Sequence, residues 1–180
     1  MQQAPNYRKL LPYLLFAAAV LWIAFASQTW TDQAAGVQAV KDRKPVADLA
    51  MPQLTGGSWR LSDHRGQVVL MNYWATWCAP CQVEMPVFVA WQRRYGSRGL
   101  QIVGISMDDD PALVREASDK LKLNYPVAMG DVKLGDLYGG VLGLPMTFLI
   151  DRHGKIQAKC QGETDLGKME IRLQSLLSSR

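Results

Sequence analysis

A mostly apolar run leads directly into two closely spaced cysteines. The run, VVLMNYW at 68–74, is followed by Cys78 and Cys81. Its length and lack of charge predict a strand that is buried on both faces of a sheet. Residues 82–96 then place apolar side chains at helical spacing, and the pattern stops at Gly96. The chain is therefore constrained to place a Cys-x-x-Cys pair where a buried strand ends and a helix begins.

The sequence downstream alternates strand and helix patterns. Asp110 is expected to cap a helix, with Pro111 at the first helical position. The predicted strands lie at 100–107, within 125–130, and on both sides of a turn at 152–154. The predicted helices lie within 108–123, at 131–140 and at 166–179, the last with Met169, Leu173, Leu176 and Leu177 on one face. This order predicts an α/β sandwich whose first units are parallel and whose final hairpin is antiparallel.

The first 30 residues do not have a globular pattern. Arg8 and Lys9 precede a stretch from Leu10 to Thr31 that contains no charged residue. A helix that crosses a bilayer needs about 20 apolar residues, and basic residues ahead of it are expected to stay in the cytoplasm. We favour a retained membrane anchor, and the alternative is a signal peptide cleaved after Ala24-Phe25-Ala26. Everything after the apolar run is exported in either case.

These features divide the chain into three parts. Residues 1–30 form the predicted anchor or signal segment, 31–44 a polar linker, and 45–180 one folded domain. The 20 basic and 16 acidic residues are scattered along the chain, so we expect no nucleic-acid partner. The expected location is the cell (inner) membrane, crossed once, with the folded domain on the extracytoplasmic, periplasmic side.

A Cys-x-x-Cys pair can attach haem, bind zinc, form a structural disulfide or exchange electrons. Haem attachment requires a histidine directly after the second cysteine, where this chain has Gln82. Structural zinc requires four ligands, and Cys160, His64 and His153 are not spaced as a second ligand pair. A disulfide across two residues closes a very small loop and adds little stability. Redox exchange is therefore the favoured role, with no metal and no cofactor.

The two cysteines are expected to differ in reactivity. A helix N-terminus lowers the pKa of a cysteine through its free N–H groups and its dipole. Cys78 should lie just ahead of the first helical turn and be partly exposed, whereas Cys81 should lie inside the helix and be shielded. We therefore expect Cys78 to attack a substrate disulfide and Cys81 to resolve the mixed disulfide, which forms a Cys78–Cys81 disulfide. Ala79 and Pro80, between them, are expected to meet the substrate and tune the redox potential.

Two motifs, NYWATWCAPC and GLPMTFLIDRHGKI, resemble the thioredoxin superfamily and, more narrowly, its membrane-tethered TlpA/ResA-type reductases. The resemblance covers about residues 45–180 and implies a thioredoxin fold, a mixed central sheet flanked by helices. It implies that Pro145 is cis, packs beside the cysteines and exposes the backbone of Leu144 to a substrate. Trp77 resembles the aromatic shield of the superfamily, although packing is the simpler interpretation of the residue alone.

Three further positions bear on the mechanism. Glu84 lies three residues past Cys81 and shares its side of the predicted helix. In TlpA/ResA-type proteins a glutamate in this place is buried, and a raised pKa would let it exchange protons with Cys81. The alternative is a glutamate that faces solvent. Pro86 matches the helix-kinking proline of the superfamily, and Asn72 replaces a buried aspartate of ordinary thioredoxins, which argues against a general cytosolic thioredoxin.

Other reactive residues are given no catalytic role. Cys160 is expected to be a buried, inert thiol on the same strand face as Ile156 and Ala158. His64 and His153 fall in polar stretches and are expected to be surface turn residues.

The features together predict an extracytoplasmic thiol–disulfide oxidoreductase that reduces client disulfides. The resemblance implies clients of the apocytochrome c or copper-assembly type, and a transmembrane thiol reductase as electron donor. A thiol peroxidase, a copper chaperone that binds through Cys78 and Cys81, and an oxidase of folding proteins remain alternatives. A peroxidatic cysteine needs Thr or Ser and Arg around it, which do not stand in the matching places, and Pro145 disfavours a bound metal.

Overall fold

The structure is a computed structural model that describes residues 37–39, 48, 50–130 and 143–179. The predicted anchor or signal segment and the predicted helix at 131–140 lie outside these residues. Within the described ranges, no helix is both long and apolar enough to cross a membrane.

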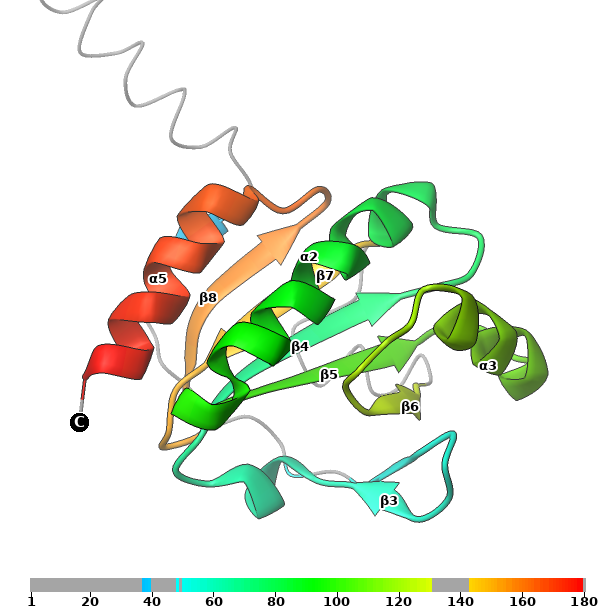
Figure 1. Cartoon of the computed structure of the whole chain (residues 1–180), viewed down its shortest axis with the longest axis horizontal. Coiled ribbons are helices and arrows are strands. Elements are labelled where there is room, and N and C mark those ends of the chain that lie inside the picture. The colour runs from blue at the N-terminus through cyan, green and yellow to red at the C-terminus, as the bar shows by residue number, and fades with distance from the viewer. Residues whose placement is uncertain (1–36, 40–47, 49, 131–142, 180) are drawn as a thin grey trace, which may run out of the picture. The chain divides into compact units, whose positions relative to one another are not determined.

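A six-stranded mixed sheet forms the centre of the folded domain (Figure 1). The strands, in their order across the sheet, are β1 (Val37–Ala39), β8 (Ile156–Gln161), β7 (Met146–Ile150), β4 (Val68–Trp74), β5 (Leu100–Ser106) and β6 (Val127–Met129). Strands β4, β5 and β6 are parallel, whereas β7 and β8 form the predicted antiparallel hairpin. β4 is buried along its whole length, as its apolar sequence predicts, because it lies between β7 and β5.

Two helices, α2 (Ala79–Tyr95) and α5 (Leu166–Ser178), lie on one face of the sheet (Figure 1). Phe88 of α2 and Leu173 of α5 belong to the same buried cluster as Leu70 of the central strand. A third helix, α3 (Pro111–Lys120), follows β5, and Asp110 caps it by accepting a hydrogen bond from the N–H of Ala112 at 2.8 Å. The predicted cap is therefore confirmed.

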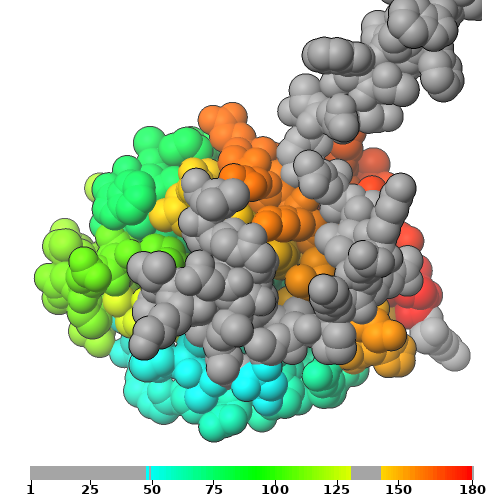
Figure 2. Space-filling model, turned by 180° about the vertical axis from the view of Figure 1, so that it is seen from behind, coloured from blue at the N-terminus to red at the C-terminus, as the bar shows by residue number. Residues whose placement is uncertain are grey.

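A short segment with little regular structure packs against part of the other face of the sheet. It contains β2 (Met51–Pro52), β3 (Ser58–Trp59) and the 3₁₀ helix η2 (Leu61–His64), and it appears in cyan and blue-green in Figure 2. Met51, Trp59 and Leu61 are buried in one cluster with alternate residues of the central strands. Strands of two residues leave no periodicity in the sequence, so neither strand was expected.

The thioredoxin-like α/β fold is confirmed, with two differences in detail. Strand β1 lies inside the predicted linker and pairs antiparallel with β8; such pairing uses backbone groups and needs no apolar pattern. The second difference concerns the strand face of Cys160. The pairing of β7 with β8 shifts register between Leu149 and Ile150. Ile156 therefore packs on one face of the sheet, whereas Ala158 and Cys160 pack on the other. The prediction that all three share one face is wrong.

Candidate active site

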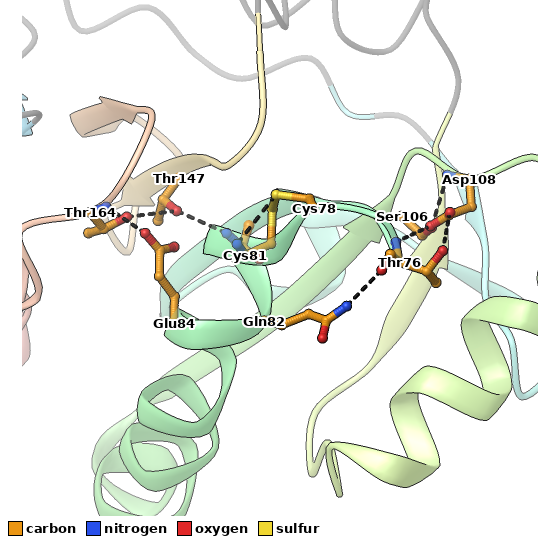
Figure 3. The surroundings of a disulfide bond; sticks show 10 residues. Thr76, Cys78, Cys81, Gln82, Glu84, Ser106, Asp108, Thr147 and Thr164 are labelled. Atoms are coloured by element: carbon orange, nitrogen blue, oxygen red, sulfur yellow. Dashed lines mark hydrogen bonds between the residues drawn. A yellow bond between two sulfur atoms is a disulfide. The ribbon is translucent and has the colours of Figure 1, made fainter.

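The two cysteines form a disulfide at the N-terminus of α2 (Figure 3). Cys78 is the N-cap residue, and its Sγ accepts a hydrogen bond from the N–H of Cys81 at 3.3 Å. Pro80, within the first turn, has a backbone angle already suited to a helix and lacks an N–H that would need a partner. The predicted position of the pair, between a buried strand and a helix, is confirmed.

The cysteines differ in exposure less than expected. Cys81 is fully buried, as predicted, but Cys78 is only 5% exposed and not partly open to solvent. The reason is that both belong to an apolar cluster against which Leu144 packs. Trp77 is 72% exposed, so the interpretation of this residue as plain packing is wrong. Its indole is open to a binding partner.

The second predicted motif approaches the disulfide. The Leu144–Pro145 peptide bond is cis, as the resemblance implied. Pro145 is buried, and Leu144 is half-buried against the cluster that contains both cysteines. The carbonyl of Pro145 accepts a hydrogen bond from the N–H of Gly162 at 2.9 Å, which ties this turn to the loop after β8.

Glu84 lies on α2 one turn beyond Cys81, and its carboxyl group is directed into the protein (Figure 3). The residue is 3% exposed, so the solvent-facing alternative is wrong. Its Oε1 accepts a hydrogen bond from the backbone N–H of Thr164, and its Oε2 has no partner among the described residues. Burial raises the pKa of Glu84, and the hydrogen bonds from Thr164 only partly oppose that rise.

Thr164 connects Glu84 to two further buried polar side chains near the disulfide, those of Thr147 and Asn72. Its hydroxyl lies 3.5 Å from the hydroxyl of Thr147, which accepts a hydrogen bond from Nδ2 of Asn72 at 3.0 Å. The sequence gives no signal for Thr147 or Thr164, since a single threonine on a strand or in a loop is an ordinary residue. Only the sheet register and the loop after β8 bring them to Glu84.

A second polar group lies on the opposite side of the disulfide (Figure 3). Asp108, two residues after the end of β5, is 8% exposed and accepts hydrogen bonds from the N–H and hydroxyl of Thr76 at 2.9 and 2.6 Å. The hydroxyl of Ser106 donates to the same carboxylate at 2.8 Å. The sequence prediction used the aspartate run 108–110 only as a helix cap. The parallel pairing of β4 and β5 is a signal that could have found Asp108, because it places their carboxyl ends side by side.

The remaining reactive residues stay outside the site chemistry. Cys160 is a buried free thiol, as predicted, and burial raises its pKa, which keeps it unreactive. His153 is exposed in the turn between β7 and β8. His64 is only half-exposed, because its ring stacks on Trp59 with the ring centroids 4.9 Å apart. In the part of the chain that the structure describes, no three His, Cys, Asp or Glu side chains converge as metal ligands.

Comparison with known proteins agrees with this geometry. Residues 43–159 match the AhpC/TSA family. The chain belongs to this family. Thiol-disulfide oxidoreductase ResA of Bacillus thuringiensis subsp. konkukian is 31% identical over 135 residues, which cover 74% of this chain and 77% of that protein. ResA of Oceanobacillus iheyensis is 37% identical over 162 residues, which cover 87% of this chain and 82% of that protein.

Solved structures give the same result. A crystal structure from Chlorobium tepidum, described as a candidate thiol:disulfide interchange protein DsbE, is 30% identical and has a TM-score of 0.71. The match covers 78% of this chain and all of that chain. This AhpC/TSA-family protein is thus a thiol–disulfide oxidoreductase of the ResA-like group, with a thioredoxin-like fold.

Proposed function

We propose that this protein reduces disulfides in exported client proteins through Cys78 and Cys81. The observation that supports this most directly is the N-cap position of Cys78. Its Sγ accepts a hydrogen bond from the N–H of Cys81 at 3.3 Å. A thiolate formed there is stabilised by that N–H group and by the helix dipole.

The reaction transfers two electrons from the dithiol to the client. The Cys78 thiolate attacks one sulfur of the client disulfide, which forms a mixed disulfide and releases the other client sulfur as a thiolate. The Cys81 thiolate then attacks Sγ of Cys78, releases the second client thiolate and closes the Cys78–Cys81 disulfide. The two protons lost by the cysteine thiols are balanced by the two that the client thiolates take up.

Glu84 is the proposed acceptor of the Cys81 proton in the second step. Cys81 is fully buried, so bulk water does not reach it, and Glu84 lies one turn away on the same helix. A buried carboxyl group whose pKa is raised holds and releases a proton closer to neutral pH than an exposed one.

The client is expected to bind across the surface that surrounds Cys78. Trp77 and Val83, 72% and 74% exposed, flank the cysteine pair along the chain. Leu113 of α3 lines a pocket that also includes Thr76, the residue before Trp77. Exposed apolar side chains next to a redox pair suit a partly unfolded protein chain. Ala79, Pro80 and Leu144, which are exposed or half-buried, complete the proposed contact surface.

The proposed location is the outer side of the cytoplasmic membrane, with residues 1–30 as a retained anchor. This proposal rests on the length of the uncharged run and the basic residues ahead of it. A transmembrane thiol reductase would return two electrons to the Cys78–Cys81 disulfide, and apocytochrome c or a copper-assembly protein would be the client. Retention of the full-length chain in alkaline-washed membranes is the expected result, and release of a shortened chain would indicate signal cleavage.

The redox potential tests the proposed direction. The full chain in detergent, with Cys160→Ser, is equilibrated with graded dithiothreitol or glutathione buffers, and thiol trapping reports the state of Cys78 and Cys81. A reductase should have a potential well below the glutathione range, whereas a value near about −120 mV, that of DsbA, would indicate an oxidant. Cys78→Ser is the control that abolishes the transition. If the Cys160→Ser chain shows no reversible two-electron transition, the redox function itself is wrong.

A further inference from the structure

Asp108 is a buried carboxylate that the thiol–disulfide reaction does not use directly. Its Oδ1 accepts the hydroxyl of Thr76, and its Oδ2 accepts both the N–H of Thr76 and the hydroxyl of Ser106. Its own N–H donates to Ser106 Oγ at 3.1 Å. Burying a carboxylate is unfavourable unless such partners replace water. The structure therefore uses a charged group to fix a single loop residue, Thr76.

Thr76 is held on its other side by the helix that carries the cysteines. The side-chain amide of Gln82 on α2 donates to the carbonyl oxygen of Thr76 at 2.7 Å. One residue away, the N–H of Cys78 donates to the carbonyl of Ala75 at 3.1 Å. The loop between β4 and α2 is thus attached to β5 through Asp108 and to α2 through Gln82 (Figure 3).

This attachment becomes important when the disulfide opens. In the oxidised protein the bond to Cys81 holds Sγ of Cys78 at the helix N-terminus. Reduction removes that bond, and the side chain of an N-cap residue can then rotate away. The thiolate is stabilised only while it remains next to the free N–H groups of the first turn.

We propose that Asp108 is a positioning residue that, through Thr76, keeps Cys78 at the N-terminus of α2 in the dithiol state. The carboxylate does not touch the substrate or the reacting sulfur atoms. Its role is to fix the loop from which Cys78 is presented. The inference rests on the proposed reactivity of Cys78, but its test below needs no client protein and no electron donor.

The test measures alkylation of Cys78 by iodoacetamide across a range of pH. The full chain carries Cys81→Ser and Cys160→Ser, so that only Cys78 reacts, and the N–H at position 81 is retained. Asp108→Ala should lower the alkylation rate at pH 7 by about tenfold, the equivalent of one hydrogen bond to a charged group. It should also move the pH profile to higher pH, because Cys78 is then no longer held next to the free N–H groups of the first turn. Thr76→Val removes only the hydroxyl and should lower the rate by about threefold.

Three neighbouring substitutions separate positioning from charge. Asp108→Asn removes the charge but keeps an oxygen for the N–H of Thr76, so its rate should stay close to that of the parent or exceed it, since a nearby negative charge disfavours a thiolate. Asp109→Ala removes an exposed charge next to Asp108 and is the matched control, which should react at the rate of the parent. Asp110→Ala removes the cap of α3 and should lower stability without changing the rate.

Each outcome bears on the proposal. An Asp108→Ala rate equal to that of the parent overturns it, and so does an Asp108→Asn rate as low as that of Asp108→Ala. If Asp108→Ala does not fold, as shown by its circular dichroism, Thr76→Val decides in its place, and an unchanged rate overturns the proposal. If the parent chain itself alkylates as slowly as a free cysteine and with the pH profile of one, that result argues against the proposed function and not against the role of Asp108 alone.

Discussion

The carboxyl group of Glu84 is buried, and burial makes its charged form unfavourable. The residue is 3% exposed, and burial raises the pKa of its carboxyl group in the folded protein. Below the usual pKa of glutamate, about 4.3, Glu84 is protonated in both the folded and the unfolded state, so its ionisation does not affect stability. Above it, the unfolded state loses its proton first, so the free energy of unfolding falls as the pH rises through the raised pKa.

Glu84→Gln should remove this pH dependence. Glutamine can still accept the N–H of Thr164 but cannot ionise. The variant should therefore gain stability relative to the parent as the pH rises from 5 to 8, as measured by urea unfolding of the oxidised protein. Glu163→Gln, at an exposed neighbouring residue, is the matched control and should follow the parent. If the free energy of unfolding depends on pH in the same way for Glu84→Gln and the parent, ionisation of Glu84 does not destabilise the folded protein.

The same substitution should slow catalysis. If Glu84 accepts the Cys81 proton, Glu84→Gln removes a general base, and such groups contribute about 10²–10⁴-fold. The decay of a mixed disulfide formed on Cys78 should slow in a stopped-flow measurement, while the first attack by Cys78 keeps its rate. Equal slowing of both steps would point to a general disturbance of the site.

At the scale of elements, α5 depends on a residue from another part of the chain. The guanidinium of Arg152, in the turn between β7 and β8, donates to the carbonyl oxygens of Leu176 and Ser179 at 2.6 and 2.7 Å and to that of Leu177 at 3.3 Å. These carbonyls lie at the end of α5, beyond the last hydrogen bonds of the helix backbone. That of Leu176 also accepts the hydroxyl of Ser179 at 3.0 Å. A cation at a helix C-terminus is favourable because it opposes the helix dipole.

Arg152→Ala should destabilise the domain by about 2 kcal/mol, since hydrogen bonds to a charged group contribute about 1.5–3 kcal/mol. Urea unfolding measures the loss. Lys155→Ala, at an exposed residue of the same turn, should change stability by less than about 0.5 kcal/mol. The redox potential should be the same in both variants, because the turn does not contact the cysteines. Equal stability of the two variants would mean that water satisfies the carbonyls at the end of α5 as well as Arg152 does.

At the scale of the whole domain, β1 decides where the sheet ends. β1 pairs with β8 through Val37–Ala39, which lie before residue 45, where the folded domain was expected to begin. Without β1, strand β8 becomes an edge with unpaired backbone groups, which favours association between molecules.

A chain that begins at residue 45 should therefore be less stable than one that begins at residue 31. A loss of about 2 kcal/mol corresponds to a decrease in Tm of roughly 5–10 °C for a domain of this size. The shorter chain should also associate at high concentration, as seen by light scattering. If both chains are monomeric and melt together, β1 contributes nothing to the sheet.

Much of the fold was predictable because its signals are local. The apolar run of β4, the Asp110-Pro111 cap and the turn before β8 each lie within a few neighbouring residues. The strands β2 and β3, of two residues each, are too short to show a period. β1 was missed because backbone pairing leaves no mark on the side chains.

The sequence by itself determined the redox pair, its place between a strand and a helix, and the second motif at Leu144–Pro145. Only the tertiary structure decided what surrounds the pair. Glu84 and Thr164 are 80 residues apart, and Thr76 and Asp108 are 32 apart. A hydrogen bond across such a distance depends on the path of the chain through the whole sheet, and no pattern among neighbouring residues can specify it.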